Sequence, residues 1–416
     1  MCVLHEELKG KGRKCMKQEE WKEREKIYAC WLCNFTSIGN GQLHKLSELC
    51  GGPEGVYYAD KNTWGQVLSP KQVESLEEYT EKWPPQAKYE EMRGEGIDLV
   101  TISDKNYPER LKTIPDAPFF LFVRGRLPTG AVPAVAVIGA RECSEYGKYV
   151  ARELGAALGR RGVVVVSGMA KGIDGISQEA ALDAGGISLG VLGSGVDVCY
   201  PAQNRRLYSR LADSGAVLSI YPNQTPARPQ NFPPRNRIVS GLADAVVVIE
   251  ARVKSGTLIT VDMALEQGRE VYVVPGRVTD RLSDGCNRLI KQGAGVFLNP
   301  ENLYEEILLL RENKKEWKIK GKNNLMERKK RREVKEESMI PKPPGGLSEE
   351  LADVWGALDF YPKNLEEIGK VLPEKYQERQ IISCLMQLCM EEMAVQVSPG
   401  HFCLKGEPPS SNVTKM

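Results

Sequence analysis

The central part of the chain alternates short apolar runs with amphipathic stretches between Ala134 and Leu298. The apolar runs are rich in Val and Ile, and continuous runs of this kind are typical of strands buried on both faces of a parallel sheet. Strands that alternate with helical patterns predict an α/β fold, an extended Rossmann-like, doubly wound sheet. The strands are expected at 134–139, 163–166, 187–193, 216–220, 245–250, 271–276 and 295–298.

Composition changes divide the remaining chain into flanking segments. Two more strands are expected before the alternating region, at 99–102 and 119–123, so the sheet domain is expected to span 91–310. The other predicted segments are a charged extension (1–25), an N-terminal helical domain (26–90), a charged linker (311–346), a winged-helix domain (347–405) and a tail (406–416).

The N-terminal helical domain contains a turn of small residues, Ile38-Gly39-Asn40-Gly41, between two helical stretches. This pattern is typical of a helix–hairpin–helix, whose turn N–H groups bind a DNA backbone. A small helical domain that packs against its neighbour fits the same residues. Both interpretations stay open on the sequence.

The C-terminal segment shows three helical stretches, at 348–358, 364–372 and 374–392, followed by a short apolar hairpin. Helices and a hairpin in this order predict a winged helix, and the third helix of such domains often reads duplex DNA. Here acidic residues offset Lys375 and Arg379, which favours a protein-contact or packing role: Glu374, Glu378, Glu391 and Glu392. The preceding basic linker could contact nucleic acid, but a solvated linker is the preferred interpretation.

Composition limits where the chain works and what it binds. No apolar run approaches the roughly 20 residues of a membrane span, and the N-terminus is charged where a signal peptide is apolar. We therefore expect a cytoplasmic protein with reduced cysteines, and no ligand cluster predicts a metal or a cofactor. The formal net charge is only +2, so any nucleic-acid binding requires a local basic patch.

Cationic side chains follow the predicted strands. Because the carboxyl ends of parallel strands meet at one edge of a sheet, these cations are expected to converge there. They are Arg141, Lys171, Arg205, Arg235, Arg237 and Lys254. Small residues in the same loops allow close backbone approach to phosphate: Gly139, Ser167, Gly168, Gly193, Gly195, Ser255 and Gly256. Cations and free N–H groups together favour a phosphate chain, and single-stranded nucleic acid is the natural polymer.

Common enzyme sites are not found in the predicted sheet domain. The chain's histidines, His5, His44 and His401, lie outside it, so a Ser-His-Asp triad cannot form there. No glycine loop is followed by the Lys-Ser/Thr pair of a P-loop, and the third strand end lacks the G-x-G-x-x-G of dinucleotide sites. The residues therefore favour binding over hydrolysis or redox chemistry.

Several ordered blocks resemble the DNA-processing protein A family (DprA, also called Smf), from about Ile97 to Phe297. The blocks are SGMAKGIDGISQEAAL, LGSGVDVCYP, FPPRNRIVSGL, EARVKSGTLIT and VPGRVTDRLSDGCNRLI, followed by QGA. The flanking segments look like that family's N-terminal helical domain and C-terminal winged helix. The resemblance implies a homodimer without catalysis that binds incoming single-stranded DNA in natural transformation, protects it and helps to load RecA recombinase.

The resemblance also implies roles for individual residues. It assigns DNA binding to Arg141, Ser167, Gly168, Lys171, Arg235 and Arg237, and loop-holding roles to Asp174 and Asn236. Two positions depart from the family's pattern. Lys171 replaces a usual arginine, which keeps the charge but loses the planar fork. Gln178 replaces a common histidine, which puts a structural hydrogen bond in doubt.

An enzyme is the alternative on the same sheet. Nucleotide phosphoribohydrolases of the lysine-decarboxylase-like group have a PGGxGTxxE loop whose glutamate assists glycosidic cleavage. The matching stretch here is RVKSGTLIT, and Thr260 occupies the place of that glutamate. The missing acid makes this the weaker hypothesis.

Overall fold

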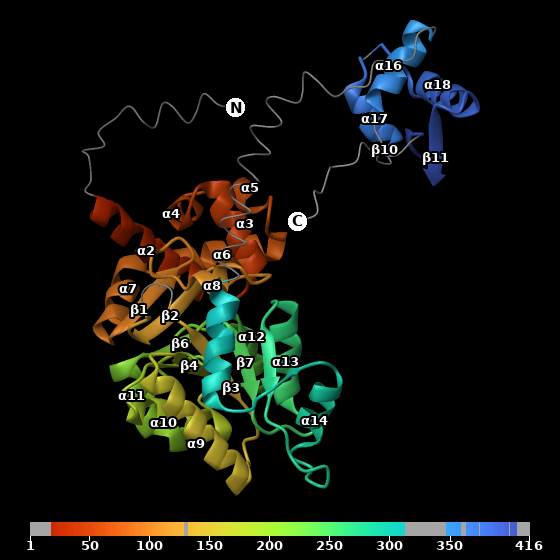
Figure 1. Ribbon diagram of the computed structural model, residues 1–416. Helices are drawn as coiled ribbons and strands as arrows, with labels where there is room; N and C mark the ends of the chain where they lie inside the picture. The colour runs from red at the N-terminus through yellow and green to blue at the C-terminus, as the bar shows by residue number, and fades with distance from the viewer. Residues whose placement is uncertain are drawn as a thin grey trace. The chain divides into compact units, whose positions relative to one another are not determined.

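The computed structural model describes residues 18–128, 132–312, 347–358, 363–373, 375–398 and 400–405. The chain divides into two compact units, Met1–Lys315 and Glu316–Met416 (Figure 1). Residues 313–346 of the predicted linker (311–346), the tail 406–416 and residues 1–17 of the expected extension lie outside the described residues, whereas 311 and 312 are helical. Among the described residues, no helix has the length and apolar character that crossing a bilayer requires.

The first unit is built on one sheet, which has nine strands within the described residues. The second strand of the chain pairs antiparallel with both of its neighbours, and all other neighbouring strands of this sheet are parallel. The predicted α/β fold with a mostly parallel sheet is therefore confirmed. In spatial order the strands are β1 (Ile97–Thr101), β2 (Phe120–Gly125), β6 (Ala216–Ser219), β5 (Ser188–Val191), β4 (Val164–Ser167), β3 (Ala134–Ile138), β7 (Ala245–Val248), β8 (Glu270–Val273) and β9 (Gly295–Val296).

The order of the parallel strands reverses at β3. The chain first proceeds through β4, β5 and β6 on one side, and then returns to place β7, β8 and β9 on the other. At such a switch point the connections leave β3 and its neighbours in opposite directions, so a crevice opens beyond their carboxyl ends. This is where a ligand site is expected.

Successive side chains of each strand point to opposite faces of the sheet, and helices cover both faces. Val135 and Val137 pack with Leu154 and Leu158 of α9 on one face. Ala136 and Ile138 belong to the core on the other face, with residues of α12 and α13. The helices are α8 (Glu109–Lys112), α9 (Glu145–Arg160), α10 (Ile173–Asp183), α11 (Arg205–Ser214), α12 (Phe232–Gly241), α13 (Gly256–Glu266) and α14 (Asp284–Lys291), and residues 300–312 are also helical.

The N-terminal helices share a core with the antiparallel edge of the sheet. Leu32 and Leu46 cluster with Leu99, Phe120 and Phe122 of β1 and β2. The helices are α2 (Gln18–Asn34), α3 (Asn40–Cys50), α4 (Pro53–Tyr57), α5 (Lys61–Trp64), α6 (Pro70–Lys82) and α7 (Pro85–Gly94).

Helix α2 begins at Gln18, inside the stretch expected to be a charged extension. Two contacts hold its first turns to the domain. Tyr89 donates a hydrogen bond of 3.1 Å to Glu23, and Arg24 forms an ion pair of 2.6 Å with Glu54. The sequence alone showed only a charged stretch, because these partners lie far along the chain.

The turn between α2 and α3 packs against the sheet domain. The Asn40 side chain donates to Asp116 Oδ1 (2.7 Å) and to Ala117 O (2.8 Å), and accepts from the Phe119 N–H (2.8 Å). His44 lies 2.9 Å from the same Ala117 oxygen. These contacts support the packing interpretation of this turn over the DNA-binding hairpin.

The second unit contains α16 (Glu349–Ala357), α17 (Leu365–Val371), α18 (Glu378–Met390) and an antiparallel sheet in the order β10-β12-β11. Its core joins Val354, Ile368 and Leu385. The strands are β10 (Lys363–Asn364), β11 (Ala394–Ser398) and β12 (His401–Leu404). Within the described residues of this unit, three helices followed by a hairpin agree with the predicted order of elements. The assignment as a winged helix stays a prediction.

Candidate nucleic-acid interface

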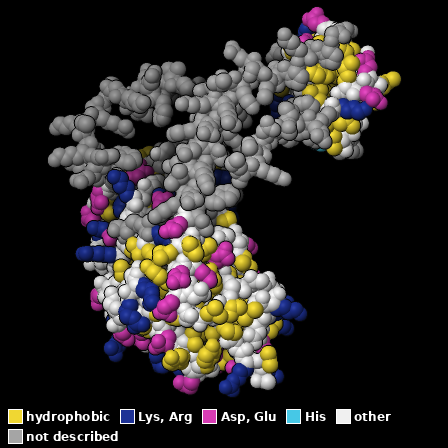
Figure 2. All heavy atoms as spheres, viewed as in Figure 1, with side chains coloured by type: hydrophobic (Ala, Val, Ile, Leu, Met, Phe, Trp, Pro, Cys, Tyr) yellow, Lys and Arg dark blue, Asp and Glu magenta, His cyan; other side chains and the backbone are white. Residues whose placement is uncertain are grey.

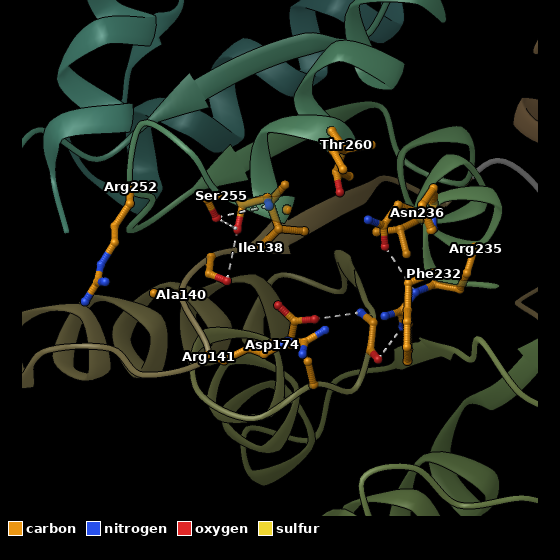
Figure 3. Close-up of a pocket in the computed structure, with 18 of the residues that line it drawn as sticks. Ile138, Ala140, Arg141, Asp174, Phe232, Arg235, Asn236, Arg252, Ser255 and Thr260 are labelled. Atoms are coloured by element: carbon orange, nitrogen blue, oxygen red, sulfur yellow. Dashed lines mark hydrogen bonds between the residues drawn. The ribbon is translucent and has the colours of Figure 1, made fainter. Parts of the chain in front are cut away.

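A cleft of about 720 Å³ opens at the switch point of the sheet (Figure 3). Its walls come from the end of β3 and the residues after it (138–142), the turn between β4 and α10, helix α12, and residues 252–260, which lead into α13 and form its first turn. A smaller hollow of about 250 Å³ shares Arg141, Gly168, Phe232 and Arg235 with it and adds Lys171. We call the two together the switch-point cleft.

Exposed cations surround the switch-point cleft. Arg141 follows β3 and Lys171 follows β4, while Arg252 and Lys254 follow β7. Elsewhere, on the face shown in Figure 2, Lys and Arg side chains are interspersed with Asp and Glu. The cleft therefore supplies the local positive charge that the near-zero net charge of the whole chain does not.

Arg235 is buried beneath the cleft and ties two strand ends together. Its Nη1 donates to the Gly168 carbonyl and, over 2.5 Å, to the Val191 carbonyl. Burial lowers the pKa of Arg235 to about 10, although the charge of Asp174 opposes this. The guanidinium therefore remains protonated at neutral pH and places a positive charge in the floor of the cleft. Its hydrogen bonds are directed largely to other groups of the protein.

The Ser167-Gly168 turn is satisfied internally. The buried Ser167 hydroxyl donates to Val137 O (2.6 Å), and the Gly168 N–H donates to Asp174 Oδ2 (3.1 Å). Burial raises the pKa of Asp174, and the charge of Arg235 acts against this rise. A Cβ at Gly168 would overlap the Arg235 guanidinium, so a larger residue there would displace Arg235 from its hydrogen bonds to the Gly168 and Val191 carbonyls. In this structure the turn therefore holds the shape of the cleft floor.

The structure brings some of the predicted residues to the cleft and leaves others outside its lining. Arg205 is the first residue of α11 and is exposed, and Arg237 is half-buried with no hydrogen-bond partner for its Nε among the described residues. Side chains two residues apart in an α-helix point about 200° away from each other around the helix axis. Arg235 and Arg237 therefore cannot both face the cleft. The predicted residues that line it are Gly139, Arg141, Gly168, Lys171, Asp174, Gly193, Arg235, Asn236, Lys254, Ser255 and Gly256.

The remaining loop residues have local roles. Ser255 caps α13, since its hydroxyl accepts from the Thr257 N–H (3.2 Å), and the Thr257 hydroxyl donates to Gly139 O (3.3 Å). The Gly195 N–H donates to Thr225 O (2.9 Å), away from the cleft lining. The β3 and β7 loops are thus joined directly, which fixes one wall of the cleft.

Sequence reasoning missed several lining residues. Arg252 directly follows the predicted strand 245–250, so its position gave a usable signal. Tyr200 and Phe232 lie with their ring centroids 5.8 Å apart, and the Arg141 guanidinium lies 5.7 Å from the Phe232 ring. Aromatic rings between cations are typical of sites that stack the bases of single strands. Nothing in the local sequence distinguished these two rings from core aromatics.

The cleft lining contains few acidic residues. Its acidic residues are Glu142 and Asp174, and the α13 position matching the phosphoribohydrolase glutamate is Thr260. Within the described part of the chain, no group of His, Cys, Asp and Glu has the arrangement of a metal site.

Comparisons with known proteins agree with this arrangement. The family model for DNA recombination-mediator protein A matches residues 98–308. DNA processing protein DprA of Bacillus subtilis (strain 168) is 41% identical over 216 residues, which cover 52% of this chain and 73% of the relative. DprA of Streptococcus pneumoniae is 42% identical over 207 residues, which cover 50% of this chain and 73% of the relative.

The X-ray structure of DprA from Streptococcus pneumoniae matches with a TM-score of 0.60 at 33% identity, and covers 67% of this chain and 97% of its own. The region matched by the family model includes the parallel sheet and the whole lining of the switch-point cleft. The resemblance inferred from the sequence blocks is therefore confirmed: this chain belongs to the DNA recombination-mediator protein A (DprA/Smf) family.

Proposed function

We propose that this protein binds single-stranded DNA in the switch-point cleft and acts as a recombination mediator. In this proposal a homodimer protects the incoming strand and delivers it to RecA recombinase. The observation that carries the DNA-binding part is the set of exposed cations, Arg141, Lys171, Arg252 and Lys254, around a deep cleft that also contains Tyr200 and Phe232. Membership of the recombination-mediator family supports the mediator role, and the parts concerning RecA and the dimer are what the resemblance of the sequence blocks implies.

A single strand suits this cleft better than a duplex. Phosphates would contact the exposed cations, while unstacked bases could reach the aromatic rings, which are accessible only to bases outside a double helix. A duplex would need an element that enters a groove, and α18, the third helix among the described residues of the second unit, begins with Glu378 and is followed by Glu391 and Glu392. The charge on that helix does not favour duplex binding.

Fluorescence titrations with single-stranded and duplex oligonucleotides over a salt series test the proposal. Removing one cation that neutralises a phosphate should make the slope of log affinity against log salt shallower by about 0.7 for a single strand. Arg141→Ala and Lys254→Ala should each do so and should cost about 1.5–3 kcal/mol of binding free energy if the contact is charge-assisted. Arg160→Ala is the matched control, because Arg160 is an exposed residue in the last turn of α9, outside the cleft lining.

Two results would overturn the DNA-binding proposal: unchanged single-strand affinity in the combined Arg141→Ala and Lys254→Ala variant, or a wild-type preference for duplex.

The same oligonucleotides test the mediator step. Adding the protein should shorten the lag before RecA assembles on the strand, and an unchanged lag would count against that step alone.

A further inference from the structure

Helix α18 of the second unit has apolar side chains on two opposite faces. Ile381 and Leu385 are buried in the core of the unit, and Figure 1 shows α16 and α17 on one side of α18. On the other face, Ile382, Met386 and Met390 are 37%, 52% and 84% exposed. A helix that is apolar on opposite faces is typical of one that is covered on both. The exposed face is therefore a candidate interaction surface.

The exposed apolar residues form one continuous stripe. Ile382, Met386 and Met390 follow one another at intervals of four residues, so they lie along one side of the helix. Methionine side chains are unbranched and adaptable, and proteins use them often at binding surfaces. We call this stripe, together with Arg379 near its start and Glu391 at its end, the outer face of α18.

The outer face has opposite charges at its two ends. Arg379 is exposed and forms no ion pair or hydrogen bond with a described residue. Glu391 accepts a hydrogen bond of 3.0 Å from the Gln387 amide and has no cationic partner among the described residues. Both charges are therefore free to pair with a surface that has the reverse order of charges.

A second copy of α18 that runs antiparallel to the first has this reverse order. If the two helices cross at Met386, then Ile382 of each copy lies opposite Met390 of the other, because both are four residues from the crossing point. Arg379 lies about 10 Å before the crossing point and Glu391 about 8 Å after it, at a rise of about 1.5 Å per residue. Each arginine then lies within reach of the other copy's glutamate.

Duplex DNA and a membrane surface fit the outer face less well. Arg379 is the cation of this face, and the carboxylate of Glu391 repels phosphates. A helix that lies on a bilayer carries Lys and Arg beside its apolar stripe. The residues beside this stripe include Ser383 and Gln387, which are uncharged. A second copy of the chain is the occupant that matches both the stripe and the charges.

We propose that two copies of this chain pair through the outer faces of α18, antiparallel, with Met386 at the twofold axis and Arg379 of each copy beside Glu391 of the other. The contact goes beyond the proposed function, because it involves neither the cleft nor DNA. One helix face is smaller than the roughly 800 Å² per partner of a standard interface, so the pairing is weak by itself. Any other contact between two copies would raise the effective concentration of one face for the other.

Photocrosslinking of the purified full chain tests the pairing. With the photoreactive residue p-benzoylphenylalanine in place of Met386, illumination should give a covalent dimer on a denaturing gel, and peptide mapping should find α18 joined to α18. The same probe in place of Val371 is the matched control, because Val371 is an apolar residue of α17 that is 63% exposed and lies outside the outer face. It should give little dimer.

Charge reversal tests the antiparallel register. Two exposed ion pairs contribute a factor of about 2 to 30 to the pairing constant, so Arg379→Glu and Glu391→Arg should each reduce the Met386 crosslink by at least that order. The combined variant exchanges the two charges and should restore it. Equal dimer yields from the Met386 and Val371 probes would overturn the pairing. A combined variant that crosslinks as poorly as the single variants would overturn the antiparallel arrangement.

Discussion

Asp244 shows how one buried carboxylate joins distant parts of the first unit. It accepts hydrogen bonds from Arg110 Nε (2.8 Å) and Nη2 (2.7 Å), from Arg311 Nη1 (3.2 Å) and from the Ala134 N–H (3.0 Å). Asp244 directly precedes β7 and Ala134 begins β3, so this network lies at the edge of the sheet opposite the cleft. It holds α8 and the helical residues 300–312 to the strands.

The network predicts a pH dependence of stability. Burial acts to raise the pKa of Asp244, but the hydrogen bonds and charge of Arg110, with the Ala134 N–H and Arg311, bring it below its ordinary value. Because the pKa of Asp244 is lower in the folded than in the unfolded protein, the ionised carboxylate stabilises the folded state. This stabilisation is complete above the unfolded-state pKa of about 3.9 and is lost as the pH falls through the folded-state pKa. In urea titrations from pH 7 to pH 3, Asp244→Asn should lose less free energy of unfolding in the acid range than the wild type does.

The same substitution should lower the free energy of unfolding at pH 7 by about 3 kcal/mol, because it leaves the arginines facing an uncharged partner. An Asp244→Asn variant whose acid-range loss equals that of the wild type would show that other carboxylates cause it. A free energy of unfolding at pH 7 equal to that of the wild type would show that the interactions of Asp244 with the arginines make no net contribution to stability.

At the scale of elements, the spacing of glycines in α9 sets its distance from α10. Gly155 and Gly159 lie four residues apart and therefore on one face of the helix. A Cβ at either position would overlap the backbone of α10, at the Ser177 and Ala181 carbonyls respectively. The loops that carry Arg141 and Lys171 lead into these two helices, so their close packing also positions one side of the cleft.

Gly155→Ala should therefore destabilise the protein even though alanine favours helix formation. Overpacking against a backbone typically costs about 1–3 kcal/mol, which exceeds the gain of up to about 1 kcal/mol in helix propensity. Thermal unfolding measures the difference. Gly41→Ala is the matched control: Gly41 lies in α3, and a Cβ there meets nothing within 4 Å, so this variant should be neutral or more stable. Equal behaviour of the two variants would refute the close-packing explanation.

At the scale of the whole molecule, the chain divides into two units, and the cleft belongs to the first of them. All the lining residues belong to Met1–Lys315. The salt dependence of affinity reports the number of phosphate contacts, wherever on the protein they lie. A chain ending at Lys315 should thus bind single strands with the affinity and salt slope of the full chain. A shallower slope for the shorter chain would show that the second unit or the basic linker also contacts phosphates.

Much of the fold could be predicted because the responsible forces are local and periodic. Runs such as Val163–Val166 and Ala245–Val248 are too apolar to be exposed on either face, and the helical patterns between them require a parallel sheet. Each predicted strand of the first unit overlaps an observed one. The convergence of Arg141, Lys171 and Lys254 on one edge followed from the same reasoning, since each lies in the segment between a strand and the next helix.

What the sequence by itself determined was therefore the order of strands and helices and the edge of the sheet where cations gather. Only the tertiary structure decided which face of each helix turns inward. It placed Arg235 under the cleft and left Arg237 outside the lining, and it packed the Asn40 turn against Ala117 and Phe119. These outcomes depend on contacts between residues far apart in the chain, and no local pattern of residues encodes such contacts.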